Sequence, residues 1–263
     1  MTAISASLVK ELRDQTGAGM MDCKRALEEA GGDMEAAVRI LRERGAAQAA
    51  KRSGRETPEG IVLVRIETGK GTLAAVGCET EPVSKNEEFR GFAQRVLETA
   101  AGGDDLESLE EERQELVGKI GENVAVVGTA RFEAVNGAKI DSYVHPPANK
   151  LGVLVQVRGG SDDFARKIAM HIAASSPRWI GREDVPEEVV TSEREIYTNS
   201  DEVQSKPEQA REKIVEGMLN KRFFGAQVLA EQPWIHETAK TVGQALEEEG
   251  AEVLEFERFA LAG

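Results

Sequence analysis

Cysteine, histidine and aromatic residues are scarce in this sequence, and long apolar runs are missing. Its 263 residues include only Cys23 and Cys78, which are too few for a disulfide framework or a cysteine-based zinc site. The longest apolar runs, such as residues 61–64, are far shorter than the ~20 residues of a membrane-spanning helix. The N-terminus has no basic stretch followed by an apolar one, so we expect no signal peptide. These absences favour a cytoplasmic protein that does not bind membranes.

Negative charge, in contrast, is abundant and unevenly distributed. The sequence has 33 basic and 47 acidic residues, for a net charge of −14. Residues 1–55 contain ten basic and eight acidic residues, whereas residues 56–263 contain 23 and 39. A body this acidic repels phosphate backbones, whose neutralisation supplies much of the affinity for nucleic acid. We therefore expect no nucleic-acid binding by residues 56–263. The charge of residues 1–55 does not exclude such binding.

Residues 1–45 have the pattern of three short helices. Candidate N-caps precede the helices and glycines follow them: Ser5, Ser7, Asp22 and Asp33 as caps, and Gly17, Gly31, Gly32 and Gly45 as terminators. The unit has few apolar residues, so we expect it to lean on a partner. Residues 46–57 lose the apolar periodicity and combine alanine and glycine with positive charge, which is typical of a basic linker that is helical at most at its start. A domain boundary is expected near residue 55.

The remaining sequence predicts an α+β core of two similar halves, residues 58–135 and 136–263. Each half has a strand pair followed by an amphipathic helix, with strands at 60–66, 73–78, 124–134, 140–144, 151–157 and 253–259. Phe92 and Phe164 match in the two helices, which indicates a duplicated antiparallel sheet with helices, although a chance likeness of two α+β units explains the register equally well. Two helices joined by a polar bend predict an inserted antiparallel helical hairpin at about 184–230.

Motifs of catalysis and cofactor binding are missing. The turn at residues 68–72 resembles a phosphate-binding loop only superficially, because Val64 stands where a glycine is needed and Gly71 follows the lysine instead of Ser or Thr. The histidines are scattered without metal-ligand spacing: His145, His171 and His236. His171 lies on an apolar helix face, where a structural role is the usual one. These features indicate a binding protein, with no cofactor, no direct nucleotide binding and no enzymatic activity.

Several segments carry a more specific signal, beginning with residues 8–24. Residues 8–13 read LVKELR, and residues 16–24 read TGAGMMDCK. Further segments follow in order: CET at 78–80, IGEN at 120–123, MHIAAS at 170–175 and KTVG at 240–243. On these motifs, which run through almost the whole chain, the sequence resembles the elongation factor Ts family, the guanine-nucleotide exchange factors of the GTPase elongation factor Tu.

The resemblance implies a fold and a set of contact residues. The three-helix unit would be the family's ubiquitin-associated-like domain, which grips the GTPase domain of elongation factor Tu. Matching positions place the following residues at the partner: Arg13, Met20, Met21, Ile120, Gly121, His145 and Ile235. Exposed consecutive methionines suit an adaptable apolar contact. One methionine filling the small helical core is an equally good interpretation.

The family's magnesium-displacing motif is Thr-Asp-Phe-Val, whose aromatic side chain wedges between helices of the GTPase. Here the matching residues are Thr80, Glu81, Pro82 and Val83. The proline removes both the aromatic ring and a backbone N–H. In one interpretation, Pro82 biases Glu81 towards an extended conformation, and the segment acts as a rigid wedge. In the other, exchange depends more on Ile120, Gly121 and the C-terminal half.

The resemblance therefore predicts nucleotide exchange without covalent chemistry. The protein would bind the GDP-bound form of elongation factor Tu, promote release of GDP and magnesium, and hold the nucleotide-free state until GTP binds. A ubiquitin-like or nascent-chain adaptor that uses the three-helix unit is the alternative, but it leaves the duplicated core without a purpose. A monomer, a homodimer and a 2:2 complex with elongation factor Tu all stay open, as does a dimer contact through the hairpin.

Overall fold

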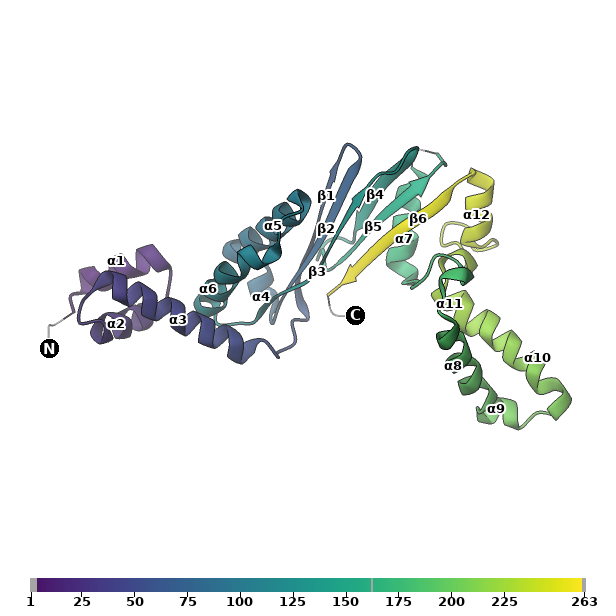
Figure 1. The fold of residues 1–263 in the computed structure, drawn as a ribbon, viewed down its shortest axis with the longest axis horizontal. Coiled ribbons are helices and arrows are strands. Elements are labelled where there is room, and N and C mark those ends of the chain that lie inside the picture. Colours follow the sequence, from purple (N-terminus) through teal and green to yellow (C-terminus); the bar gives the residue numbers. More distant parts are fainter. Residues whose placement is uncertain (1–3, 162, 262–263) are drawn as a thin grey trace.

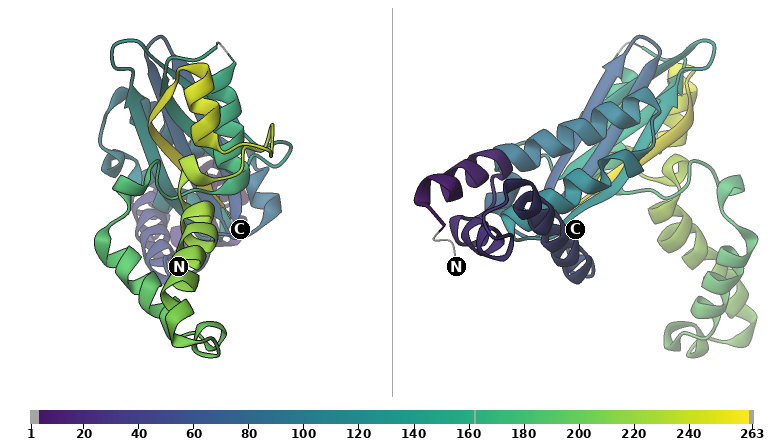
Figure 2. Two further views of the ribbon diagram at one scale, coloured as in Figure 1. Left: turned by 90° about the vertical axis from the view of Figure 1, so that its right-hand side faces the viewer. Right: turned by 60° about the vertical axis from the view of Figure 1, so that its left-hand side comes forward.

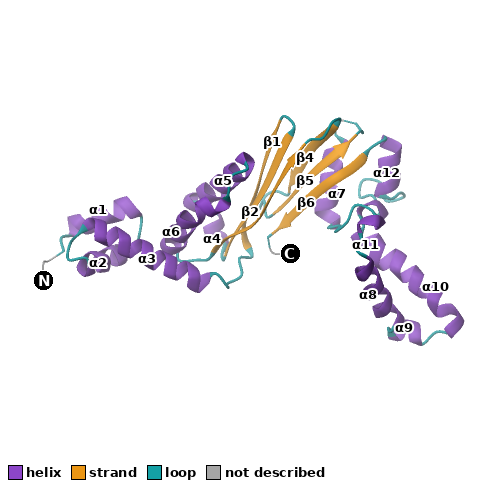
Figure 3. Ribbon diagram, viewed as in Figure 1, coloured by secondary structure: helices purple, strands orange, loops and turns teal. Residues whose placement is uncertain are grey.

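The computed structural model describes residues 4–161 and 163–261, which form an elongated molecule of successive layers (Figure 1). A three-helix unit lies at one end and a helical hairpin at the other. Between them, the strands gather in the middle of the molecule with helices on both sides (Figure 3). The expected α+β class is confirmed.

The N-terminal unit consists of three helices: α1 (Ala6–Thr16), α2 (Met20–Glu29) and α3 (Met34–Arg52). Ser5 and Asp33 cap α1 and α3, as expected. Their side-chain oxygens accept hydrogen bonds from the backbone N–H groups of Leu8 and Ala36, respectively. Gly17 ends α1 in the left-handed conformation, with a φ of 65°. The caps therefore lie where the sequence pattern predicted them for these two helices.

Helix α3 continues through Gly45 to Arg52, so the expectation that it ends at Gly45 is wrong. The reason is its packing against α6 (Glu110–Ile120), where Gly45 meets Gly118. A Cβ on Gly118 would lie only 2.8 Å from the Cα of Gly45. One turn further, Ala49 is 1% exposed and belongs to the core between these helices and the first sheet. The small residues are therefore a close-packing helix face, and residues 46–52 are helical, as expected for the start of the segment 46–57.

Two three-stranded antiparallel sheets form the centre of the molecule. Sheet A contains β1 (Glu59–Glu67), β2 (Lys70–Cys78) and β3 (Val124–Glu133). Sheet B contains β4 (Ala138–Val144), β5 (Leu151–Arg158) and β6 (Glu252–Ala260). In both sheets the strands follow chain order, and the pairing of the second strand with the third has a register shift. This shared layout supports an internal duplication.

The two sheets pack face to face. Their shared apolar core includes Val62, Leu73, Ala75, Phe132, Leu154 and Leu261. Glycines allow the close approach, because a Cβ on Gly71 would lie 2.5 Å from Ile140, and one on Gly152 would lie 2.5 Å from Val62. On its other face, β2 contributes Ala74 to the core beneath the helices of sheet A. The central strand is therefore buried on both sides.

Helices cover the outer face of each sheet. On sheet A lie α5 (Glu87–Gly102), the 3-10 turn Leu106–Leu109 and α6, and on sheet B lie α7 (Phe164–Ser175) and α12 (Val242–Glu249). The short helix α4 (Glu81–Ser84) connects β2 with α5. Phe92 of α5 and Phe164 of α7 are both buried against their own sheets. The matching positions predicted from the sequence therefore have matching roles.

A helical hairpin projects from the sheet B side of the molecule (Figure 2). It consists of α8 (Glu187–Thr198), α9 (Asp201–Gln204) and α10 (Glu208–Met218), followed by the π-helical turn Leu219–Phe224 and α11 (Gly225–Gln227). Short 3-10 turns lie before and after it, at Arg182–Asp184 and Leu229–Glu231. The hairpin has an apolar core of its own. In the described part of the chain, no helix is both long and apolar enough to cross a membrane.

Candidate functional site

The residues assigned to a partner by resemblance fall into groups on different parts of the molecule. Arg13, Met20 and Met21 lie on the three-helix unit, and the segment 80–83 lies beside Ile120 and Gly121 at one end of sheet A. The other two residues, His145 and Ile235, belong to the second half of the core.

The segment 80–83 forms the start of helix α4. Thr80 is extended, with φ and ψ of −130° and 153°, and Glu81 is already helical. The expectation that Pro82 keeps Glu81 extended is therefore wrong, and the bend comes one residue earlier. The turn closes because the Ser84 N–H and hydroxyl donate to the carbonyls of Thr80 and Glu81. Val83 is buried as an anchor, and Pro82 is exposed.

The C-terminal end of α6 lies next to this segment. Ile120 is partly buried against the core of sheet A. Gly121 ends the helix in the left-handed conformation, with a φ of 83°, and its N–H donates to the carbonyl of Val117. Apart from its own neighbours along the chain, no atom lies within 4 Å of the position that a Cβ on Gly121 would occupy. The helix end is therefore open to an incoming partner.

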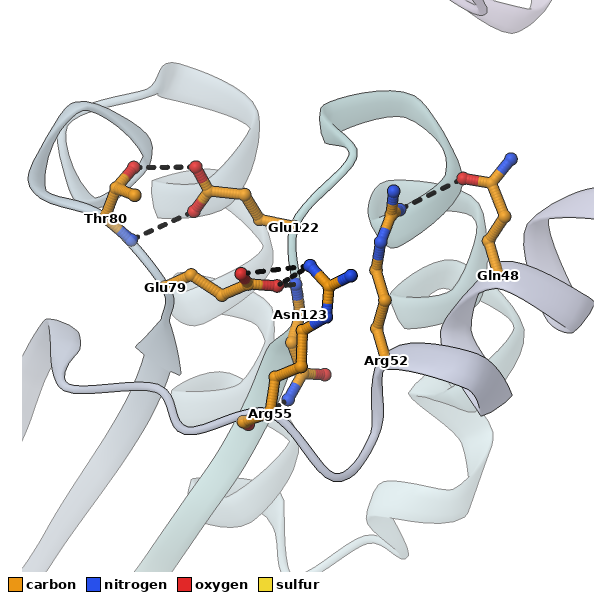
Figure 4. A network of polar contacts seen from close by, with 7 residues as sticks. All are labelled: Gln48, Arg52, Arg55, Glu79, Thr80, Glu122 and Asn123. Carbon is orange, nitrogen blue, oxygen red and sulfur yellow. Dashed lines mark hydrogen bonds and ion pairs between the residues drawn. The ribbon is translucent and has the colours of Figure 1, made fainter.

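A network of polar contacts joins the two segments (Figure 4). The Glu122 carboxylate accepts hydrogen bonds from the Thr80 N–H at 3.0 Å and from the Thr80 hydroxyl at 2.7 Å. A second hydrogen bond has its acceptor on the other segment: the Glu79 carboxylate accepts from the Asn123 N–H at 2.7 Å. Glu79 also accepts from Arg55 at 3.2 Å, and the Asn123 side chain donates to the Arg55 carbonyl. The structure thus brings residues 80–83 and 120–121 together into one surface.

Electrostatics favours the charged form of Glu79 in this network. The hydrogen bond from the Asn123 N–H, followed by the hydrogen bond and charge of Arg55, holds the pKa of Glu79 below its ordinary value. A carboxylate therefore fits this junction better than a neutral side chain does.

The turn that carries His145 lies at the same end of the sheets. Lys150 in this turn forms an ion pair at 2.5 Å with Glu59, the first residue of β1. Glu59 pairs with Cys78, the last residue of β2, two residues before the segment 80–83 begins. His145 is exposed, and its Nδ1 lies 2.8 Å from the Tyr143 hydroxyl. His145 therefore lies at the end of the sheets from which the segment 80–83 also emerges.

Met20 and Met21, the consecutive methionines at the start of α2, both point into solvent. Helix α2 begins at Met20 after Gly19, so Asp22 lies within its first turn and is not the cap that we expected. Met20 is 52% exposed and Met21 64% exposed, and the interpretation of a methionine filling the core is wrong. Arg13 is exposed on α1. These side chains provide an apolar and cationic surface away from the helical core.

The three-helix unit is held against α6 by more than the glycine contact. Arg42 of α3 forms ion pairs with Glu111 and Glu115, both at 3.0 Å. Lys119 lies against Gly17 and forms an ion pair with Glu88 of α5. The unit is thereby docked on the helix whose end carries Ile120 and Gly121.

Ile235 lies in the segment between Leu229–Glu231 and α12, beside α7. It is 39% exposed, and its N–H donates to Nδ1 of His171 at 3.4 Å. His171 is fully buried, and its Nε2 lies 2.9 Å from Oε1 of Gln232. Because the Gln232 amide nitrogen donates to two backbone carbonyls, Oε1 is the acceptor and His171 carries its proton on Nε2. The structural role expected for His171 is therefore confirmed: it supports the Ile235 segment.

The described part of the chain offers neither a metal-binding cluster nor an exposed cysteine. Residues 4–161 and 163–261 contain no cluster of three or more His, Cys, Asp or Glu that could hold a metal. Both cysteines are free and buried, and burial raises the pKa of Cys78 to about 12, so it stays a thiol. Residues 68–72 form the turn between β1 and β2 and the start of β2, as expected from the missing phosphate-loop spacing.

Sequence reasoning missed the residues that join the two segments, namely Arg55, Glu79, Glu122 and Asn123. Their partners are 24 to 68 positions apart in the chain. Two signals were available. Glu79, Glu122 and Asn123 fall in the motif segments CET and IGEN. In addition, Glu79 directly follows β2 and Asn123 directly precedes β3, two strands that pair with each other.

Comparison with known proteins identifies the family. The profile of the family described as Elongation factor TS matches residues 79–263. Elongation factor Ts of Pasteurella multocida is 45% identical over 265 residues, and that of Escherichia coli strain K12 / DH10B is 44% identical over 265 residues. Both alignments cover 98% of this chain and 92% of the relative. Elongation factor Ts of Idiomarina loihiensis is 43% identical over 269 residues, with 98% and 90% covered. The chain therefore belongs to the elongation factor Ts family.

Proposed function

We propose that the chain is the guanine-nucleotide exchange factor of elongation factor Tu in translation elongation. It binds the GDP-bound GTPase, promotes release of GDP and magnesium, and holds the nucleotide-free state until GTP binds. The observation that carries the proposal is the single surface formed by residues 80–83 and 120–121 in a member of the elongation factor Ts family. The chain makes and breaks no covalent bond in this role.

The exchange reaction follows from thermodynamic linkage. A factor that binds nucleotide-free elongation factor Tu more tightly than the GDP-bound form weakens GDP binding by the same factor. A thousandfold acceleration of GDP release requires about 4 kcal/mol of differential stabilisation. One side chain supplies only part of this, so contacts at several places are needed. A docked three-helix unit and a rigid core supply such separate contacts.

We assign the contacts as follows. Arg13, Met20 and Met21 bind the GTPase domain, and Ile120 and Gly121 press on it beside residues 80–83. The other two positions, His145 and Ile235, contact the remaining domains of elongation factor Tu. The exposure of the methionines and of Pro82 supports this assignment, because the side chains are available without unfolding.

Residues 80–83 act as a rigid wedge without an aromatic side chain. The family's phenylalanine would contribute about 1.5–3 kcal/mol when buried at the partner. Pro82 lacks that ring, but α4 presents it on a short helix anchored by Val83 and by the Thr80–Glu122 contact. We therefore infer that the surface at Ile120 and Gly121 carries a larger share of the exchange activity.

If Ile120 and Gly121 contribute more to exchange than Pro82 does, two variants should differ in how strongly they slow GDP release. Pro82→Ala keeps the anchors of α4 and should slow GDP release by less than about threefold. Gly121→Val places a β-branched residue at a φ of 83°, which strains the backbone by about 1–2 kcal/mol or more and moves Glu122. It should slow GDP release at least tenfold in a stopped-flow assay with fluorescent GDP. A collapse of activity in Pro82→Ala, with Gly121→Val active, would reverse the assignment.

Size-exclusion chromatography with light scattering tests the proposal and the stoichiometry together. The chain and cognate elongation factor Tu should co-elute without nucleotide and separate when GDP is added in excess. Co-elution that is indifferent to GDP would contradict the linkage. The mass of the complex distinguishes 1:1 from 2:2, and the mass of the chain alone distinguishes a monomer from a homodimer.

A further inference from the structure

Side-chain hydrogen bonds join two connections in the first half of the core. One connection links β2 with α4, and the other links α6 with β3. The last main-chain pair of these strands is Cys78 with Val124. Beyond it, Glu79 accepts from the Asn123 N–H, and Thr80 donates its N–H to Glu122. Two carboxylates therefore extend the contact between the strands by two more residues on each side. Such charge-assisted hydrogen bonds are stronger than neutral ones.

The contact of Glu122 with Thr80 changes how α4 is capped. Thr80 occupies the N-cap position of α4, where a threonine hydroxyl ordinarily accepts from an N–H of the first turn. Here the Thr80 side chain accepts no such hydrogen bond, and its hydroxyl donates to Glu122 instead. Pro82 in the first turn has no N–H, so the helix offers one donor fewer to the cap. The threonine is thereby free to bind a partner outside its own helix.

The geometry makes Glu122 the link between two parts of the proposed exchange surface. Glu122 directly follows Gly121, and Thr80 directly precedes α4, the helix that carries Pro82. Both hydrogen bonds of Glu122 end on Thr80, one on the main chain and one on the side chain. Two bonds to one residue fix its orientation as well as its distance. A wedge such as α4 displaces groups in its partner only if its own position stays fixed under the contact.

We propose that Glu122 is a positioning residue for nucleotide exchange, which holds α4 at a fixed place relative to Gly121. It acts through Thr80, so that Pro82 and Gly121 press on the GTPase as one rigid body. This inference rests on the proposed exchange function. A rigid surface lowers the barrier to GDP release within the complex, whereas a loosened α4 still binds but displaces less.

The test is the concentration dependence of fluorescent-GDP release from cognate elongation factor Tu. Glu122→Ala should lower the maximal rate at saturating chain about tenfold, while the half-saturating concentration changes less than threefold. Glu122→Gln retains an acceptor for the Thr80 N–H and a polar partner for its hydroxyl, and it should recover the rate to within about threefold of wild type. Glu107→Ala is the matched control, because it removes one negative charge from an exposed 3-10 turn outside the network. It should leave both parameters unchanged.

A second variant keeps the test independent of the folding of Glu122→Ala. Thr80→Val removes the hydroxyl but keeps the N–H, and it should lower the maximal rate about threefold. In the Glu122→Ala background, the same change should have no further effect, because its partner is already gone. Full additivity of the two changes would overturn the proposal, because it would mean that Thr80 and Glu122 act separately.

The outcomes separate this inference from the function on which it rests. A wild-type chain that leaves GDP release unchanged would overturn both. A wild-type chain that accelerates release, together with an equally fast Glu122→Ala, would overturn only the role of Glu122. A Glu122→Ala chain that raises the half-saturating concentration at an unchanged maximal rate would make Glu122 a simple contact residue and would also overturn it.

Discussion

The contact between α3 and α6 offers a sharp test of how the three-helix unit is docked. A Cβ added to Gly118 would lie 2.8 Å from the Cα of Gly45, which is closer than real Cβ contacts allow, and the obstacle is backbone that cannot rotate away. The variant Gly118→Ala therefore forces the two helices apart. The same substitution at Gly217 of α10 meets no atom within 4 Å, so it isolates the intrinsic preference of a helix for alanine.

The magnitude follows from two opposing effects. Alanine in place of glycine in a helix contributes up to about 1 kcal/mol of stability. Overpacking of a tight contact costs about 1–3 kcal/mol. Gly217→Ala should therefore raise the free energy of unfolding by about 0.5–1 kcal/mol, and Gly118→Ala should lie about 1–3 kcal/mol below that control.

Urea denaturation of the two variants and the wild type measures this difference. Amide hydrogen exchange of residues 46–52 in Gly118→Ala should also become faster, because this part of α3 depends on α6. Equal stabilisation by both substitutions would refute the reasoning, since it would mean that α3 and α6 do not meet as closely as Gly45 and Gly118 do here.

Two further predictions concern the methionine surface and the buried histidine. Met20→Ala combined with Met21→Ala should change the free energy of unfolding by less than about 0.5 kcal/mol, because both side chains are exposed, yet weaken binding to elongation factor Tu about tenfold or more in titration calorimetry. Burial lowers the pKa of His171 in the folded chain. As the pH falls through about 6.5, the ordinary pKa of histidine, this side chain therefore binds a proton more readily in the unfolded chain than in the folded one. The stability contributed by neutral His171 is therefore fully present above that pH and is lost as the pH falls. Urea denaturation between pH 7 and 5 should show a steeper loss for wild type than for His171→Gln, and parallel curves would contradict this.

Local patterns in the sequence were sufficient for most of the elements. Strands were expected at 60–66 and 151–157, and they span Glu59–Glu67 and Leu151–Arg158. Asp33 was recognised as a cap because it is followed by a regular apolar periodicity, and its side chain does accept the expected hydrogen bond. These patterns involve residues that are close in sequence, and tertiary contacts did not change the secondary structure that they predict.

The errors occurred where one residue type serves two purposes. Gly45 was interpreted as a helix end, but a helical glycine also permits close approach of a second helix, and only the position of Gly118 decides between them. Asp22 was interpreted as a cap, but acidic residues are equally favourable within the first turn. Glu81 precedes a proline, which disfavours helix, yet the hydrogen bonds of Thr80 and Ser84 close the turn around it.

The candidate surface was only partly predictable. The motif segments 80–83 and 120–121 were recognised from the sequence by resemblance, but their proximity was not. It depends on Glu122 meeting Thr80 across 42 positions of the chain, and on the β2–β3 register that aligns the two junctions. No local pattern encodes such a contact, because glutamate is common in this acidic chain and Thr80 and Glu122 are far apart in sequence.

The rate of fluorescent-GDP release from cognate elongation factor Tu tests the central claim most directly. With an excess of unlabelled GDP as trap, the release rate should rise with the concentration of the chain and saturate at least a hundredfold above the intrinsic rate. A release rate that stays unchanged at saturating concentrations of the whole chain would contradict the account.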